Sequence, residues 1–556
     1  MTYIEIGYLF FELLKNNKYT KVVCQYKGGL TMNRQHLLAP AQYNIVDEFE
    51  KYALDGEKVA LLVYEEDGTT KQITYQALLE KANQVANVFH STGLQKGDIV
   101  LVMVPRSIEA YITYIGALKA GLVIIPSSEL LRTKDIEYRI AHAKVKAVVA
   151  HHQYVEQFTA IDGFEEIAAF TTGDDVANWT NLFQASETAS TTFTVVQTAA
   201  DDTAFLAYTS GTTGNPKAAV HSHGWGYAHL RTTAKSWLGV EEGNIVWATA
   251  APGWQKWIWS PFLATLGSGA TAFVYCGKFK ATKFLDIIAQ QKIDVLCCTP
   301  TEYRLMAKVE NLADYKFTTL KSAVSAGEPL NREVIETFNH HFGVDVRDGY
   351  GQTENTLLVG TLLGMEMRPG SMGKPTPGNV VDIINEEGEI VAVGEVGNIA
   401  VHESTPALFK GYLYDTERTK MQYCGEWFLT GDRARKDEDG YFWFEGRSDD
   451  MIISSGYTIG PFEVEDALIK HEAVKECAVV ASPDEVRGAV VKAFVVLQEG
   501  VEPTDALVEQ LQQHVKSLTA PYKYPRKIEF LQELPKTVSG KIRRAHLRQT
   551  EQQVKK

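Results

Sequence analysis

The chain has 556 residues, of which 45% are hydrophobic and 22% are charged, so we expect a globular protein with more than one domain. The formal net charge of −14 argues against a nucleic-acid binder or a protein of anionic membrane surfaces. No apolar run approaches the length of a membrane span. The six cysteines include no Cys-x-x-Cys pair, which argues against a disulfide framework or a cysteine zinc site and favours a reducing, cytoplasmic location.

Residues 1–31 are predicted to be an N-terminal extension outside the fold, because Met32 opens a segment that resembles an ordinary start. The apolar run near the beginning carries Glu5 and Glu12 and has no leading positive charge, so it does not resemble a signal peptide. A helix in YLFFELL that binds a membrane or a partner stays open as an alternative.

From residue 73 onward, amphipathic helical patterns alternate with short apolar runs that end in turn residues. Apolar spacing predicts helices over 73–89 and 107–121. Strands are predicted within 97–105, 122–126, 146–152, 203–209, 245–251, 295–300 and 321–327. This alternation predicts an α/β fold with mainly parallel sheets flanked by helices, in which ligands bind beyond the carboxyl ends of the strands.

The pattern changes after GRSDD (446–450). Strands are predicted at 476–482 and 490–498, and helices at 462–471 and 505–518, which indicates a small α+β domain of ordinary size. The predicted organisation is therefore an N-terminal domain over 32–447, a hinge at 448–450 and a mobile C-terminal domain over 451–556.

The loop YTSGTTGNPK follows an apolar strand and is rich in hydroxyl groups. Its glycines allow backbone N–H groups to approach an oxyanion, and its hydroxyls add donors. The candidate phosphate-binding residues are Thr209, Ser210, Gly211, Thr212, Thr213, Gly214 and Lys217. The spacing is not that of a Walker loop, since the two glycines are three apart and the lysine follows a proline. Taken alone, the loop is also compatible with a hydroxyl-rich surface turn.

Five further motifs follow in order: AGEP (326–329), DGYGQTE (348–354), WFLTGD (427–432), GRSDD (446–450) and PKTVSGKIRR (535–544). Tyr350 offers an aromatic face for a base, and Glu354 offers an oxygen ligand suited to Mg²⁺ beside phosphates. Asp432 suits ribose hydroxyls, and Arg447 is a planar donor for ribose or phosphate. Each motif alone has an ordinary interpretation, such as an exposed turn or a basic tail, but their combination is very improbable by chance.

These motifs resemble those of the adenylate-forming (AMP-binding) superfamily, over about residues 43–547. GRSDDMIISSGYTIGPFEVE and APGWQKW resemble its acetyl-CoA and medium-chain acyl-CoA synthetase branch. The resemblance implies an ATP-dependent acid–thiol ligase with Mg²⁺, ATP and CoA. A carboxylate first attacks the α-phosphorus of ATP and gives an acyl-adenylate and pyrophosphate, and then a thiol displaces AMP. Because two anions must meet, the protein has mainly to position them and neutralise charge.

The resemblance also implies a role for each motif. Residues 209–217 would hold the β- and γ-phosphates, and Lys541 would bridge the carboxylate and the α-phosphate. Thr353 would contact the α-phosphate and Glu354 would hold Mg²⁺. The adenine and ribose would lie against Gly327, Glu328, Pro329, Asp348, Gly349 and Tyr350, with Asp432 and Arg447 on the ribose hydroxyls.

By the same resemblance, the C-terminal domain rotates about Asp449 between the two steps. The rotation withdraws Lys541 and brings up a thiol tunnel around Ser455, Gly456 and Tyr457, as in other hinge closures. Thr458 departs from the arginine that related enzymes often carry, and Ala251 with Pro252 replaces the usual acidic start of DxGW. The first departure implies either compensation by neighbouring cations or weaker handling of nucleotide or CoA.

The acyl pocket is expected at Gly351 and Trp254. Acetyl-specific relatives carry a tryptophan at the position of Gly351, so glycine leaves room for more than two carbons, and Trp254 gives an apolar wall. We therefore expect a short- to medium-chain or branched acid, with acetate or an aromatic acid as alternatives. Two other functions stay open: an adenylating enzyme that loads a carrier protein, for which the basic C-terminal segment would suit, and a non-catalytic adenylate sensor.

Overall fold

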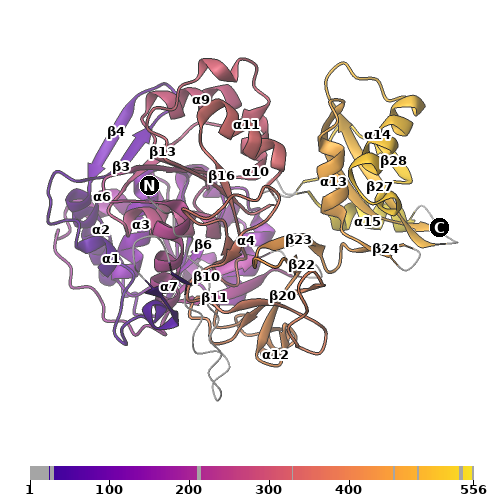
Figure 1. Ribbon diagram of the computed structural model, residues 1–556. Coiled ribbons are helices and arrows are strands. Elements are labelled where there is room, and N and C mark those ends of the chain that lie inside the picture. Colours follow the sequence, from indigo (N-terminus) through magenta and orange to yellow (C-terminus); the bar gives the residue numbers. More distant parts are fainter. Residues whose placement is uncertain are drawn as a thin grey trace, which may run out of the picture.

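The computed structural model describes residues 24–25, 31–209, 215–328, 330–454, 457–484, 487–536 and 542–553. A large body carries most of the chain, and a smaller body carries its C-terminal part (Figure 1). Most of the predicted extension lies outside the described residues. Its described parts, β1 (Cys24–Gln25) and the first residue of β2 (Thr31–Met32), belong to one antiparallel pair. Within the described residues, no helix is both long and apolar enough to cross a membrane.

The first large sheet has seven strands in the order β11-β10-β6-β5-β7-β8-β9. All neighbours are parallel except β10 and β11. The strands are β5 (Ile99–Met103), β6 (Val123–Pro126), β7 (Ala147–His151), β8 (Ala168–Thr172), β9 (Thr180–Asn181), β10 (Thr203–Thr209) and β11 (Lys217–Ser222). The predicted helices are present as α2 (Tyr75–Ser91) and α3 (Ile108–Lys119), whose first turns are capped by the hydroxyls of Thr74 and Ser107.

The second large sheet has nine strands in the order β18-β17-β16-β15-β14-β12-β13-β3-β4, parallel in its centre and antiparallel at its edges. The strands are β3 (Val59–Tyr64), β4 (Thr70–Thr74), β12 (Ile245–Ala248), β13 (Thr271–Tyr275), β14 (Val295–Cys298), β15 (Ser322–Ala326), β16 (Val346–Gly351), β17 (Leu357–Gly360) and β18 (Lys374–Pro375). Every strand predicted in the N-terminal part of the chain is present, which confirms the α/β class.

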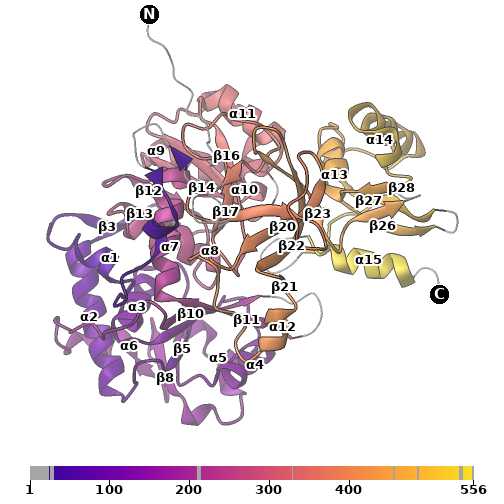
Figure 2. The same ribbon diagram turned by 60° about the horizontal axis from the view of Figure 1, so that its bottom comes forward.

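A third sheet in the large body is antiparallel and was not part of the prediction. It contains β19 (Val381–Ile384), β20 (Val396–His402), β21 (Tyr423–Cys424), β22 (Trp427–Lys436) and β23 (Phe442–Arg447). β20, β22 and β23 lie between the two large sheets and the C-terminal body (Figure 2). Asp432 lies inside β22, because the alternation of buried and half-buried positions continues beyond it to Arg435.

The smaller body has the predicted α+β composition. It contains β24 (Ile452–Ser454), β25 (Tyr457–Ile459), β26 (Val474–Asp484), β27 (Gly488–Leu497), β28 (Lys527–Phe530), α13 (Pro461–Ile469), α14 (Asp505–Leu518) and α15 (Arg544–Gln553). One face of the β26-β27-β28 sheet packs on α13 and α14 through aliphatic side chains. Arg544 fixes the start of α15 through two bonds to Glu465, at 3.1 and 2.7 Å.

The remaining helical segments are short. They are η1 (Arg34–Leu37), α1 (Asp47–Glu50), α4 (Thr133–Ala143), η2 (His152–Tyr154), α5 (Glu156–Thr159), η3 (Phe164–Glu166), α6 (Leu182–Glu187), α7 (His223–Thr233), η4 (Ala234–Leu238), α8 (Gln255–Trp257), η5 (Ile258–Ala264), α9 (Ala281–Gln290), α10 (Pro300–Ala307), η6 (Leu312–Asp314), α11 (Arg332–Phe342), α12 (Thr416–Lys420) and η7 (Pro521–Lys523). The domain boundaries at 447 and 451 stay predictions.

Candidate active site

Several candidate residues lie where strands of the two large sheets end. β10 ends at Thr209, the first residue of the candidate phosphate loop, and β15 ends one residue before Gly327. β16 pairs in parallel with β15, so that Gly349 lies opposite Ala326. These positions lie at the carboxyl ends of the parallel strands, where ligands of such folds bind.

Only the two ends of the candidate phosphate loop can be placed. Ser210, Gly211, Thr212, Thr213 and Gly214 lie outside the described residues. Thr209 and Lys217 face each other across the β10–β11 pair. The Lys217 amine donates to the Tyr412 hydroxyl at 2.5 Å and lies 3.4 Å from the Glu354 carboxylate. The loop therefore ends in a cation that points at the predicted metal ligand.

Glu354 is buried and held by a residue that carried no sequence signal. The Tyr412 hydroxyl donates to Glu354 Oε1 at 2.8 Å, and burial, with the neighbouring Glu354 charge, raises the pKa of Tyr412. Thr353 precedes Glu354 in the same turn and is half-buried. Lys217, Tyr412 and Glu354 thus form one cluster, in which a lysine balances a carboxylate that is almost out of contact with water.

The second cluster is built around Asp432. Its Oδ2 accepts from the Tyr350 hydroxyl at 2.6 Å and from the Gln352 amide at 2.7 Å, and its Oδ1 lies 3.3 Å from the Arg447 guanidinium. Asp432 and Arg447 also face each other in the β22–β23 register. Burial lowers the pKa of Arg447, but the carboxylates of Asp432 and Asp449 outweigh it and raise that pKa. Gln352 was missed, although it lies inside a motif that the sequence singled out.

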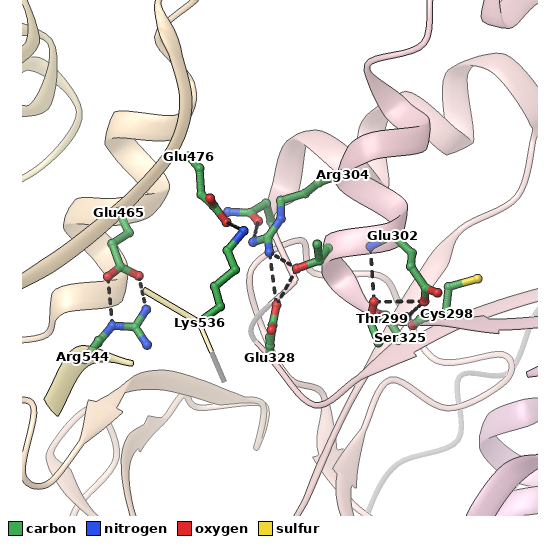
Figure 3. Close-up of polar contacts among 12 residues, drawn as sticks. Cys298, Thr299, Glu302, Arg304, Ser325, Glu328, Glu465, Glu476, Lys536 and Arg544 are labelled. Carbon is green, nitrogen blue, oxygen red and sulfur yellow. Dashed lines mark hydrogen bonds and ion pairs between the residues drawn. The ribbon is translucent and has the colours of Figure 1, made fainter. Parts of the chain in front are cut away.

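The AGEP segment divides between two environments. Gly327 has φ of +109°, a conformation that favours glycine, and a side chain there would meet nothing within 4 Å. Glu328 Oε2 instead accepts from Arg304 at 3.1 Å and from the Thr301 hydroxyl at 3.0 Å, both on α10 (Figure 3). Pro329 lies outside the described residues. Gly327 therefore leaves open space at the strand end, while Glu328 is bound to a helix.

Asp348 lies inside β16 with its carboxyl group buried. Burial raises the pKa of this carboxyl to about 7, even though Oδ1 accepts from the Gly349 N–H at 2.8 Å. The Asp348 carbonyl accepts from the indole of Trp237 at 3.0 Å, and a side chain at Gly349 would come within 2.5 Å of the same indole. Asp348 and Gly349 therefore have a packing role beside their predicted place at the adenine.

Replacing Asp348 with asparagine is expected to stabilise the protein more at about pH 8 than at about pH 5. Because folding raises the pKa of this carboxyl, the folded wild type binds the proton more tightly, and raising the pH from about 4 to about 7 removes stability that the variant does not lose. The difference in free energy of unfolding between the variant and the wild type should change by on the order of 2 kcal/mol between these two pH values. It is measured as the shift in thermal midpoint at each pH. The exposed Asp162, changed to asparagine, is the control, and a shift independent of pH would contradict the expectation.

Gly351, expected at the acyl pocket, lies beside an aromatic residue that the sequence did not single out. Trp254 is half-buried at the start of α8. A side chain at Gly351 would meet the Thr356 carbonyl at 2.0 Å and the Trp259 indole at 3.0 Å. The Lys256 amine lies 4.6 Å from the centre of the Trp237 ring and 5.6 Å from that of Trp259. The backbone thus gives Gly351 a further reason to be glycine, and the acyl-pocket roles of Gly351 and Trp254 stay predictions.

The predicted hinge residue Asp449 lies between two arginines. Its carboxylate is 3.4 Å from Arg447 and 3.5 Å from Arg548 on α15, and Arg548 also pairs with Asp450. Ser455 and Gly456 lie outside the described residues. Tyr457 is described only through its backbone, which pairs with Ser454 across β24 and β25.

Lys541 also lies outside the described residues, but both flanks of its segment are placed. Lys536 and Ile542 form a β-bridge, and the Arg543 N–H donates to the Pro535 carbonyl at 2.8 Å. The Lys536 amine lies 2.8 Å from Glu476 (Figure 3). The two flanks of the segment that carries Lys541 are therefore joined to each other, and Lys536 anchors them to β26.

Together these clusters bring a lysine, an arginine and two buried carboxylates close to the carboxyl ends of parallel strands, where ligands of α/β folds bind. The profile of AMP-binding enzymes matches residues 49–413, and that of the AMP-binding enzyme C-terminal domain matches residues 463–541. The chain belongs to the AMP-binding enzyme family, which confirms the resemblance in the motifs.

Relatives and solved structures agree with this membership. The chain is 59% identical to an uncharacterised acyl-CoA ligase, YtcI, of Bacillus subtilis (strain 168), over 94% of this chain and 99% of the relative. It is 40% identical to the mitochondrial acyl-coenzyme A synthetase ACSM3 of Mus musculus, over 87% and 86%. The structure of an anthranilate CoA ligase, AuaEII, with anthranoyl-AMP matches at a TM-score of 0.86 and 29% identity, over 93% and 99%. That of a benzoate CoA ligase from Burkholderia xenovorans LB400 matches at 0.80 and 29%, over 91% and 100%.

Proposed function

We propose that the protein is an AMP-forming carboxylic acid:CoA ligase, which activates its acid as an acyl-adenylate and then forms the acyl-CoA. The observation that carries the proposal is the pair of clusters Lys217–Tyr412–Glu354 and Tyr350–Asp432–Arg447, which the segment 350–354 joins. The relatives named as acyl-CoA synthetases support it. Asp432 and Arg447 suit the ribose, and Lys217 suits the phosphates.

In this proposal the residues of the site act mainly by neutralising charge. The phosphates of ATP and the carboxylate of the acid repel each other, so cations must hold them in line for attack on the α-phosphorus. In this proposal Lys217 and the loop hold the phosphates that leave, Thr353 contacts the α-phosphate, and Lys541 bridges it to the acid. The same site then takes CoA beside Tyr457 after the C-terminal domain has turned about Asp449.

The buried Glu354 carboxylate fits the way in which Mg²⁺ usually binds beside phosphates. Mg²⁺ commonly takes one or two carboxylates, waters and substrate phosphates rather than a cage of protein ligands. Within the described ranges, no group of three or more histidine, cysteine or acidic side chains could hold a metal ion. When bound, Mg²⁺ would neutralise phosphate charge, and Glu354 would hold it.

We further propose that the acid is short- to medium-chain or branched and that the enzyme is cytoplasmic. The aromatic ring of Trp259 beside Gly351 supports an apolar acyl group, since each buried methylene contributes about 0.8 kcal/mol. An aromatic acid is the second candidate, because two solved relatives are named for anthranilate and benzoate.

One panel tests the proposal. Purified protein with Mg·ATP and CoA is supplied with straight acids from acetate to decanoate, branched acids, and benzoate, and acyl-CoA and AMP are measured. We expect the highest kcat/KM for a straight acid between butyrate and octanoate or for a branched acid. In a control, a carrier-bound pantetheine arm replaces CoA as the thiol acceptor. A higher kcat/KM for acetate would overturn the chain-length proposal, and ATP–pyrophosphate exchange without any acyl-CoA would favour carrier loading. No exchange with any acid would favour the adenylate sensor.

A further inference from the structure

Two aromatic side chains on α4 contact both ends of the candidate phosphate loop. The Tyr138 hydroxyl donates to the Pro216 carbonyl at 3.0 Å, directly before β11. His142 Nδ1 lies 2.8 Å from the Tyr208 hydroxyl, near the end of β10. Residues 138 and 142 are one helical turn apart and so lie on one face of α4. We call Tyr138 and His142 the α4 clamp.

The α4 clamp is preorganised by its own packing. The two rings stack with centroids 5.3 Å apart and an interplanar angle of 11°, and the edge of the Tyr208 ring meets both. The Arg139 guanidinium lies 5.0 Å from the centre of the Tyr208 ring. Ile136 and Ile140, on the buried side of α4, pack into the aliphatic cluster that includes Leu206. The helix is therefore fixed to the strand that leads into the loop.

The two hydrogen bonds of the α4 clamp satisfy polar groups that take no part in the β10–β11 ladder. The ladder pairs Thr209 with Lys217, so the Pro216 carbonyl lies beyond its last pair. Burial lowers the pKa of His142 and raises that of Tyr208, so a neutral imidazole can accept from a protonated phenol. Both bonds join neutral groups at about their normal lengths.

The clamp also faces the charged side of the loop. The residues that line a cavity of about 290 Å³ include Tyr138, His142, Pro216, Lys217 and Arg418. α4 lies beside β11 and α12 (Figure 2). Lys217 points from this wall toward Glu354, so a displacement of the loop's end would move the cation at the predicted phosphate site.

We propose that Tyr138 and His142 are positioning residues that set the affinity for the β- and γ-phosphates of ATP by holding both ends of the phosphate loop. The proposal rests on the proposed function, because it takes the loop as the phosphate-binding element. It requires neither residue to touch the nucleotide. The clamp should therefore matter for ATP and not for AMP, which lacks the two outer phosphates.

The test compares ATP and AMP binding by calorimetry in the full-length protein without acid or CoA. Tyr138→Phe keeps the ring and removes one hydroxyl, and we expect it to raise the Kd for ATP about fivefold, the worth of one hydrogen bond, with the Kd for AMP unchanged. His142→Leu should act similarly, whereas His142→Asn, which keeps an acceptor near Nδ1, should stay within about twofold of wild type. Tyr414→Phe is the matched control, because Tyr414 is 67% exposed and its ring, which the variant keeps, is the part that meets the His142 ring and the Lys144 amine.

Thermal midpoints are measured on all four variants. The proposal is overturned if Tyr138→Phe and His142→Leu keep the wild-type Kd for ATP, or if ATP and AMP lose affinity together. Wild-type protein that binds ATP no more tightly than AMP would also overturn it. If wild type binds ATP tightly but forms no acyl-CoA, the ligase proposal fails, while the comparison of ATP with AMP still decides the role of the clamp.

Discussion

Changing Lys541 to alanine is expected to slow acyl-adenylate formation by about 100-fold or more. The first step brings the substrate carboxylate to the α-phosphate, and both groups are negative. A lysine amine between them is a compact cation on a flexible stem, and its loss leaves the repulsion in the transition state uncompensated. Transfer of a supplied acyl-adenylate to CoA does not bring these two anions together, so that step should stay within a few-fold of wild type.

The measurement is pyrophosphate release in a single turnover, alongside acyl-CoA formation from synthetic acyl-adenylate. Lys536→Ala is the matched control, because Lys536 lies on the same anchored segment and pairs with Glu476. It removes the same charge and should leave both half-reactions nearly intact. Equal loss of the two half-reactions in the Lys541 variant, or equal loss in the control, would contradict the proposed role.

The fold could be predicted from local patterns because the buried parallel strands are continuous apolar runs. β5, β6 and β14 are such runs, and each is followed by turn residues or a helix. The antiparallel sheet was missed because its strands include polar residues and because β22 alternates between buried and half-buried positions. That alternation is also common in exposed hairpins, so it does not place the sheet between two domains.

The candidate site also contains both residues that the sequence could predict and residues that it could not. Motif residues such as Asp432 and Arg447 could be predicted, because each lies in a recognisable sequence motif. Tyr412 could not, since it reaches Glu354 across 58 residues and Lys217 across 195. Such a contact depends on the register of β11 against the residues after β20, and no local spacing encodes that register. Contacts of this kind become visible only once the chain is folded.

Changing Asp449 to proline is expected to spare acyl-adenylate formation and to reduce thioester formation by about 100-fold, the usual cost of misplacing reacting groups by about 1 Å. Proline fixes φ near −65° and removes the N–H. If the C-terminal domain turns about this residue, the variant is locked in one arrangement. The structure offers a second explanation for any effect, because the Asp449 carboxylate also joins Arg447 to Arg548 on α15.

Asp449→Ala separates the two explanations, since alanine removes both ion pairs but leaves φ free. Backbone rotation predicts that alanine keeps both half-reactions within a few-fold while proline loses only the second. A latch made by the ion pairs predicts that alanine behaves like proline, and that Arg548→Gln, which breaks the α15 side alone, does so as well. Ion pairs this exposed contribute little on their own, so we expect the backbone, and not the carboxylate, to decide the rate of the second step in single-turnover measurements.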